Sequence, residues 1–185
     1  MIVLGVDPGT ATTGYGVVAR GRDGAVSLLE CGVIRTTPRS DLARRVAEIY
    51  EGIEEVLTRR TPEIVAVEGI FYSRNARTAM VLGHARGAVL LAAAQRELPV
   101  AEYSPAEVKH AIVGSGRATK EQIQFMVQRL LRLKAPPQPA DAADAVAIAL
   151  CHCYALAAAR LATLAQNDRV GAAARHRPAA AGGAA

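Results

Sequence analysis

The chain has 185 residues, which allows one compact domain and excludes architectures that need two domains of ordinary size. Its 22 lysine and arginine residues against 17 acids give a formal net charge of +5, which favours a polyanionic partner. The surplus is concentrated in residues 71–134, which hold ten basic residues and four glutamates. The base composition of the genome could explain the total number of basic residues, because it can produce an alanine- and arginine-rich chain. It explains their clustering in one stretch less well.

Cysteine usage and the first residues predict a cytoplasmic protein. The three cysteines are odd in number and lie in apolar surroundings, which indicates buried thiols in a reducing compartment. Residues 1–7 contain no basic leader and end on an acid, unlike a signal peptide. The alanine-rich run 142–165 is interrupted by charged residues, so we expect a buried helix there and no membrane span.

Hydrophobic periodicity predicts strands in the first part of the chain, followed by one amphipathic helix. Apolar runs bounded by glycine and proline indicate strands at residues 2–7, 14–19, 26–36 and 64–67. From Asp41, apolar residues recur at three and four positions, which predicts a helix that packs on the sheet and ends before Pro62. Three strands therefore precede the first helix.

Helices dominate the second part of the chain. We expect a helix at about 76–97, a strand at 100–103, and helices that begin near Ser104, Thr119 and Ala140. In the first of these helices, Gly83 and Gly87 share one face and would permit close approach of another helix, either in the core or at a dimer seam. The expected fold class is therefore α/β, a mixed sheet with helices on its faces.

The end of the chain differs in composition from the rest. Residues 166–185 are rich in alanine, glycine and arginine and lack periodicity. We therefore expect a single domain at residues 1–165 and a disordered tail at residues 166–185.

Four carboxylates are the candidate catalytic residues. Asp7 and Glu68 each follow an apolar run, which places both at the ends of buried strands where loops open to solvent. Asp141 and Asp144 are three residues apart at the start of a helix, so their side chains project from one face. An aspartate near a helix N-terminus is also an ordinary cap, so this pair alone is weak support.

If these acids converge, they predict a site for divalent cations. Clustered carboxylates repel one another and raise one another's pKa unless cations neutralise them, and an all-oxygen set selects Mg²⁺, with Mn²⁺ as a substitute. Two such cations about 3.5–4 Å apart would activate water and stabilise the departing 3′ oxygen in phosphodiester cleavage. The triplet 151–153, Cys-His-Cys, is no zinc site, because neighbours on a helix point about 100° apart.

Residues 7–16 resemble the opening motif of the RuvC-type Holliday-junction resolvases, which belong to the ribonuclease H-like nucleases. Further motifs follow in family order over roughly residues 1–155: Val67-Glu68 with Phe71, the stretch 75–87, Val108-Lys109, Val113-Gly114 and Ala140 to Ala145. Each motif alone is weak, whereas the ordered set is highly specific. The resemblance implies a ribonuclease H-like mixed five-stranded sheet with helices on both faces, in which Asp7, Glu68, Asp141 and Asp144 bind the metals.

The resemblance also implies an activity and partners. It predicts a structure-selective endonuclease that resolves Holliday junctions in DNA recombination and repair by nicking two opposing strands, which leaves 5′-phosphate and 3′-hydroxyl ends. A homodimer would match the two-fold symmetry of the four-way junction DNA. Preference for a short thymine-containing sequence and cooperation with junction-binding and branch-migration motor proteins of the RuvA and RuvB type are implied as well.

Basic and aromatic side chains are candidates for DNA contact. Phe71 follows the second acid and matches the family's wedge position, where it could stack on an unpaired base, although such a ring also fills cores. Lys120 could in addition stabilise the charged transition state as a catalytic residue. Each basic side chain could instead be solvated surface, and family members often carry lysine in place of Arg74. The expected DNA-binding set is Phe71, Arg74, Arg77, Lys109, Arg117 and Lys120.

Two other classes of function remain alternatives. An actin-like or sugar-kinase-like ATPase would use the turn after Asp7 to cradle phosphate, but that fold needs two domains and a second phosphate loop. A non-catalytic junction-binding module would not need four acids at the positions where the family's motifs have them.

Overall fold

The structure is a computed structural model that describes residues 1–69 and 76–175, with the backbone alone described at residues 76–78, 164 and 167–175. The strands in these segments are β1 (Ile2–Asp7), β2 (Thr12–Arg20), β3 (Val26–Arg35), β4 (Ile64–Glu68) and β5 (Val100–Tyr103). The helices are α1 (Leu42–Arg60), α2 (Ala76–Gln95), α3 (Pro105–Val113), α4 (Lys120–Leu130) and α5 (Ala140–Arg175).

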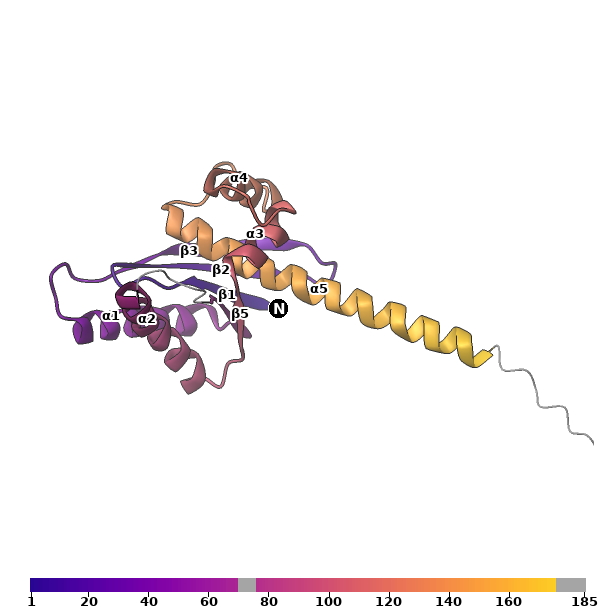
Figure 1. Ribbon diagram of the computed structural model, residues 1–185, viewed down its shortest axis with the longest axis horizontal. Helices are drawn as coiled ribbons and strands as arrows, with labels where there is room; N and C mark the ends of the chain where they lie inside the picture. Colours follow the sequence, from indigo (N-terminus) through magenta and orange to yellow (C-terminus); the bar gives the residue numbers. More distant parts are fainter. Residues whose placement is uncertain (70–75, 176–185) are drawn as a thin grey trace, which may run out of the picture.

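The strands form one mixed sheet in the order β3-β2-β1-β4-β5. The first three strands are joined antiparallel, whereas β4 and β5 are added in parallel beyond β1. Helices α1 and α2 lie on one face of this sheet, and α3, α4 and α5 lie on the other (Figure 1). The predicted α/β class, a mixed five-stranded sheet with helices on both faces, is confirmed.

Successive side chains of β1 point to opposite faces of the sheet and enter two separate core layers. Leu4 and Val6 are fully buried and join Ile53 of α1 in the core beneath α1 and α2. Val3 points to the opposite face and joins Ile148 of α5 in the second core. Because both faces of β1 are covered, this strand is apolar along its length and leaves only its last residue free for chemistry.

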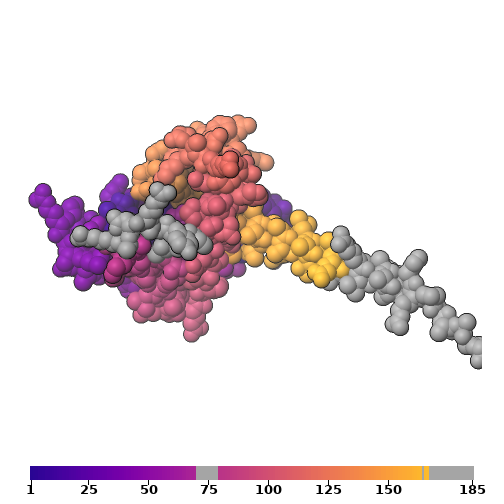
Figure 2. All heavy atoms as spheres, in the orientation of Figure 1, coloured from indigo at the N-terminus to yellow at the C-terminus, as the bar shows by residue number. Residues whose placement is uncertain are grey.

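Helix α5 crosses the sheet and then leaves it. Residues 142–153 of the helix are almost completely buried against β1 and β2, with Asp144 partly exposed, and the helix then projects away from the body (Figure 1, Figure 2). The stretch Ala140–Thr163 is long and apolar enough to cross a membrane by composition, but half of its most apolar 18-residue window is buried inside the fold. Core packing therefore accounts for the apolar composition of residues 142–153, whereas the expectation of a buried helix is wrong for residues 154–163, which are partly or fully exposed.

The start of β2 and the end of α5 differ from the predicted boundaries by two residues or more. Strand β2 begins at Thr12, two residues earlier than expected, because Thr12 pairs with Arg35 of β3 and extends the ladder. Helix α5 continues to Arg175, past the expected end of the domain at residue 165, while residues 176–185 lie outside the described part of the chain. Alanine has a high intrinsic helix propensity, which favours helix in this segment. The helix was not predicted because an alanine-rich segment shows no apolar periodicity.

Candidate active site

Asp7 and Glu68 lie side by side at one edge of the sheet. Strands β1 and β4 are parallel neighbours, and Val6 pairs with Val67, so the next residue of each strand reaches the same edge. Both carboxylates are partly buried. The prediction that the two acids end buried strands is therefore confirmed, and the structure adds that the two strands are neighbours.

Three glycines allow α5 to rest directly on the sheet. A β-carbon on Gly5 would overlap the backbone of Ala145, and one on Gly16 would stand 2.5 Å from a methyl group of Val146. A β-carbon on Gly14 would overlap the carbonyl oxygen of Asp141. Because no side chain separates the helix backbone from the strands, the first turn of α5 lies against the end of β1.

These glycines were not identified as functional by sequence reasoning. The available signal was the alternation of Gly14 and Gly16 in β2, opposite Gly5 in β1, which marks a strip without side chains on one face of the sheet. The strip determines where α5 docks and therefore where its two aspartates lie.

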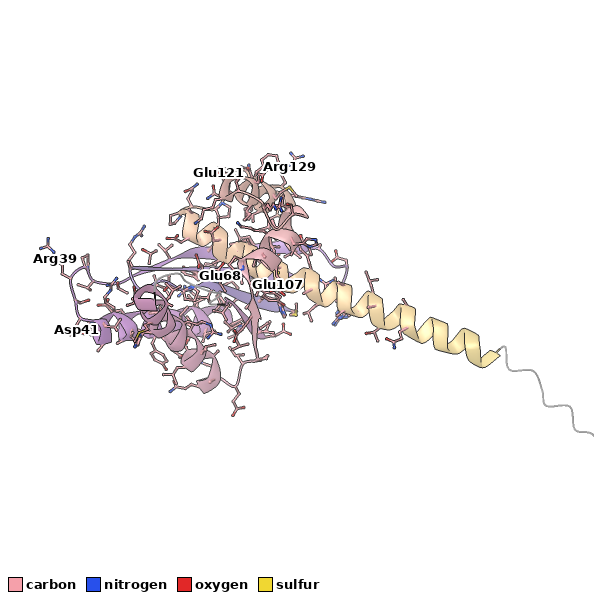
Figure 3. All side chains as sticks on the ribbon, viewed as in Figure 1. Arg39, Asp41, Glu68, Glu107, Glu121 and Arg129 are labelled. Atoms are coloured by element: carbon pink, nitrogen blue, oxygen red, sulfur yellow. The ribbon has the colours of Figure 1, made fainter. Side chains whose placement is uncertain are left out.

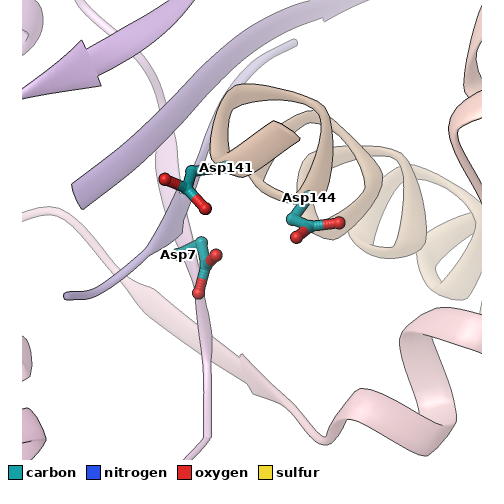
Figure 4. A group of neighbouring side chains, drawn as sticks. All are labelled: Asp7, Asp141 and Asp144. Carbon is teal, nitrogen blue, oxygen red and sulfur yellow. The ribbon is translucent and has the colours of Figure 1, made fainter. Parts of the chain in front are cut away.

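The two aspartates of α5 reach the edge where β1 ends. One carboxylate oxygen each from Asp7, Asp141 and Asp144 lies within 4.8 Å of the others (Figure 4). Glu68 lies outside this tight group but lines the same pocket, beside Asp7 and Asp144. The structure therefore brings together four acids that come from three separate parts of the sequence.

Burial and mutual repulsion make the ionised forms of Asp7 and Glu68 unfavourable, although Lys120 offsets part of the effect. Burial, followed by the charges of Glu68, Asp144 and Asp141, raises the pKa of Asp7 from 3.8 to about 7, against the opposing effect of Lys120. Burial and then the charge of Asp144 also raise the pKa of Glu68. A hard divalent cation would relieve this repulsion, and carboxylate oxygens are its preferred ligands, so the four residues fit Mg²⁺ or Mn²⁺.

Two lysines line the pocket that contains the acids, which has a volume of about 410 Å³. Lys120 is the first residue of α4, after a capping box formed by Thr119 and Gln122, and its Nζ donates a hydrogen bond of 3.0 Å to Asp144 Oδ2. This contact raises the pKa of Lys120 and keeps it cationic. Lys109 enters the pocket from α3, which follows the expected capping box at Ser104.

The remaining predicted DNA contacts lie outside this pocket or outside the described residues. Arg117 is exposed in the turn between α3 and α4. The backbone of Arg77 belongs to the first turn of α2, and its side chain is among those not described. Phe71 and Arg74 lie outside the described residues. The DNA-binding roles of all these residues stay predictions.

The triplet 151–153 is part of the core. Cys151, His152 and Cys153 are all buried, and His152 Nδ1 lies 2.7 Å from the hydroxyl oxygen of Tyr103. Arg86 forms an ion pair with Glu102 that ties α2 to β5. Neither group contributes to the acidic pocket.

The chain is similar to known proteins over most of its length. The family model described as crossover junction endodeoxyribonuclease RuvC matches residues 3–152. The protein of the same name from Moorella thermoacetica is 53% identical over 146 residues, which cover 79% of this chain and 87% of that protein.

Solved structures are similar over the same region. The RuvC structure from Thermus thermophilus aligns with a TM-score of 0.78 at 43% identity and covers 85% of this chain and 97% of that chain. A structure described as T. thermophilus RuvC in complex with Holliday junction substrate aligns with a TM-score of 0.76 at 42% identity, over 84% of this chain and 95% of that chain. From the family model and these relatives together, we conclude that the chain belongs to the crossover junction endodeoxyribonuclease RuvC family.

Proposed function

We propose that this protein is a magnesium-dependent, structure-selective endonuclease that resolves Holliday junctions during DNA recombination and repair. It nicks two opposing strands and leaves 5′-phosphate and 3′-hydroxyl ends. The observation that carries the proposal is the group formed by Asp7, Asp141 and Asp144, whose oxygens lie within 4.8 Å of one another. The Thermus thermophilus relative in complex with Holliday junction substrate supports the choice of DNA substrate.

The carboxylates act as ligands in this proposal and not as nucleophiles. Asp7, Glu68, Asp141 and Asp144 would hold the divalent cations, with Mg²⁺ as the natural metal and Mn²⁺ as a substitute. When bound, such cations activate water and stabilise the leaving 3′ oxygen in phosphodiester hydrolysis. Lys120 holds Asp144 in place through its hydrogen bond and adds positive charge where the phosphorane-like transition state gains negative charge.

Basic residues around the pocket would hold the DNA. Lys109 lines the pocket, and Arg117 is exposed in the turn that precedes α4. Both would contact phosphates, whose neutralisation supplies most of the affinity in such complexes. Phe71, Arg74 and Arg77 complete the proposed DNA-binding set, with Phe71 stacked on a base at the crossover.

A homodimer is the proposed assembly. The outer surface of α2 carries Met80 and Leu91, whose exposed fractions are 68% and 51%. Between them, a β-carbon on Gly87 would meet nothing within 4 Å. Such an apolar helix face with small residues suits close packing against a second copy, and a two-fold dimer would engage both symmetric halves of a junction.

The cellular setting follows from the substrate. A protein that resolves recombination intermediates works in the cytoplasm, where the bacterial chromosome lies, and receives its junctions from binding and branch-migration proteins of the RuvA and RuvB type.

The proposed function is tested by incubating the purified full chain with a synthetic four-way junction whose strands are labelled one at a time. With Mg²⁺ we expect nicks at symmetric positions in two opposing strands, sealed afterwards by DNA ligase, and no nicks with a chelator. A junction that is retarded in a gel but never nicked with Mg²⁺ or Mn²⁺ would indicate a binding module. Nucleotide hydrolysis without DNA would indicate the ATPase alternative.

A further inference from the structure

Arg35, the last residue of β3, lies on the same face of the sheet as the acids. In the antiparallel ladders, Asp7 pairs with Gly14, and Thr12 pairs with Arg35. Paired residues point to one face, and residues two apart on a strand share that face. Gly14 faces Asp141 of α5. Because Thr12 and Arg35 share the face of Gly14, they also point to the side of the sheet that holds the acidic pocket.

The separation between Arg35 and Asp7 suits one stretch of DNA backbone. Two strand spacings of about 4.8 Å and two residue rises of about 3.3 Å place their Cα atoms roughly 12 Å apart. Successive phosphates of one strand advance by about 3.4 Å along the helix axis of the duplex. Arg35 is therefore within reach of a phosphate about two to four nucleotides from one held at the acids.

Arg35 carries an exposed charge at the end of β3. Its side chain is exposed, and it makes no ion pair or hydrogen bond with any side chain that the structure describes. On the opposite face of the sheet, by contrast, Arg59 and Arg60 of α1 both pair with Glu30, and Arg96, which follows α2, pairs with Glu54. An exposed charge that the described side chains do not neutralise, on the edge where the acids lie, is available for a ligand.

The corner between β3 and α1, residues 36–41, carries a second exposed arginine. Hydrogen bonds hold this corner against the turn that follows Asp7. Arg39 is exposed at its outer end and points away from the body (Figure 3). Arg45 of α1 donates from Nε to the carbonyl oxygen of Thr10 and to Thr36 Oγ1, both at 3.0 Å. These hydrogen bonds tie the corner to the turn that follows Asp7, so Arg35 keeps a fixed position relative to the acids.

Arg35 adds a basic side chain on the β3 side of the acids. Asp7 and Glu68 end the neighbouring strands β1 and β4, Lys109 of α3 lines their pocket, and Arg35 ends the edge strand β3. We infer that Arg35 binds a DNA phosphate on the β3 side of the acidic pocket, with Arg39 as an outer contact. The inference rests on the proposed function and adds a contact outside residues 71–134, where the basic surplus of the sequence lies.

A salt titration of junction binding tests this contact. Each phosphate contact with duplex DNA contributes about 0.9 to the slope of log affinity against log salt concentration. With a chelator present to prevent cutting, we expect Arg35→Gln to lower the slope by about 0.9 for each bound subunit. Arg35→Lys restores the slope, because lysine also neutralises a phosphate.

Arg22→Gln is the matched control. Arg22 is an exposed arginine in the turn at the opposite end of the same β2–β3 hairpin, and we expect it to leave the slope unchanged. An unchanged slope in Arg35→Gln, or an equal fall in Arg22→Gln, overturns the inference. Nicking of the junction by the unaltered chain with Mg²⁺ is measured in parallel, so that failure of the proposed function is recognised separately.

Discussion

The backbone of Asp141 lies so close to Gly14 that a β-carbon on Gly14 would overlap its carbonyl oxygen and stand 2.6 Å from its carbonyl carbon. Gly14 is therefore the point at which the sheet determines the position of the first turn of α5. Since Asp141 belongs to that turn and Asp144 follows it three residues later, the geometry of the acid cluster depends on a residue that carries no functional group.

Replacement of Gly14 by alanine should damage stability and catalysis together. The added methyl group forces α5 away from the sheet, and overpacking of this kind costs about 1–3 kcal/mol of unfolding free energy. A displacement of the acids by about 1 Å can lower the cleavage rate roughly 100-fold. Urea unfolding and single-turnover cleavage measure the two effects.

Gly116→Ala is the control for this substitution, because a β-carbon there would lie 3.7 Å from its nearest neighbour, the carbonyl oxygen of Ala106. We expect little change in stability or rate. If Gly14→Ala cleaves as fast as the unaltered protein, the docking of α5 does not control the cluster.

Asp7→Asn should abolish cleavage and leave junction binding intact. The substitution removes a charged ligand from the centre of the cluster but no contact to a phosphate. Strand nicking and gel retardation, measured on the same preparation, separate the two properties. Asp23→Asn, in the exposed turn between β2 and β3, is the control that keeps both. Loss of binding in Asp7→Asn would contradict this division of roles.

Removal of Lys120 should move the pH dependence of cleavage. The charge of Lys120 lowers the pKa values of Asp7 and Glu68, so in Lys120→Gln both acids hold their protons to higher pH. We expect a cleavage rate at least roughly 10-fold lower at neutral pH and a profile shifted to alkaline pH. Lys134→Gln, an exposed lysine before α5, should leave the profile unchanged. A lower rate without a shifted profile would argue against this electrostatic role.

The stability of the metal-free protein should fall as pH rises. The pKa of Asp7 is about 7 in the folded protein and near its ordinary value of 3.8 in the unfolded chain. A raised folded-state pKa means that the stabilising contribution is complete below the unfolded pKa and is lost as pH rises through the folded pKa. Between pH 5 and pH 8 we therefore expect the Tm of the unaltered chain to fall relative to that of Asp7→Asn.

Magnesium should reverse this loss. Binding requires ionised carboxylates, so Mg²⁺ should raise the Tm of the unaltered chain more at pH 8 than at pH 5. Thermal unfolding with a chelator or with Mg²⁺ measures both effects. Parallel pH curves for the unaltered chain and Asp7→Asn, or an equal effect of Mg²⁺ on both, would show that Asp7 is not part of the cation site.

A bulky residue at Gly87 should prevent dimerisation without unfolding the chain. Within the subunit a β-carbon at Gly87 meets nothing, and leucine favours helix more than glycine does, so Gly87→Leu should keep or raise the Tm. Light scattering coupled to gel filtration should then report a monomer. Ala43→Leu, at an exposed position of α1, should remain dimeric. A dimeric Gly87→Leu would place the interface elsewhere.

Much of the architecture could be predicted from local patterns. The capping boxes at Ser104 and Thr119 form as expected, and the apolar runs before Asp7 and Glu68 are buried strands. These features depend on hydrogen bonds and side-chain spacing within a few residues, which sequence displays directly. The helix beyond residue 165 was not predicted, since alanine without an apolar face produces no periodicity.

The sequence by itself determined the strands and helices up to residue 165, apart from their exact ends, and it determined that acids stand at the ends of two buried strands. Tertiary structure alone decided that the strip of Gly5, Gly14 and Gly16 receives α5, that Lys120 reaches Asp144, and that Arg35 points to the acidic face. The reason is physical. Secondary structure arises from contacts between near neighbours in the chain, whereas the active site arises from close packing and strand register between segments far apart in it.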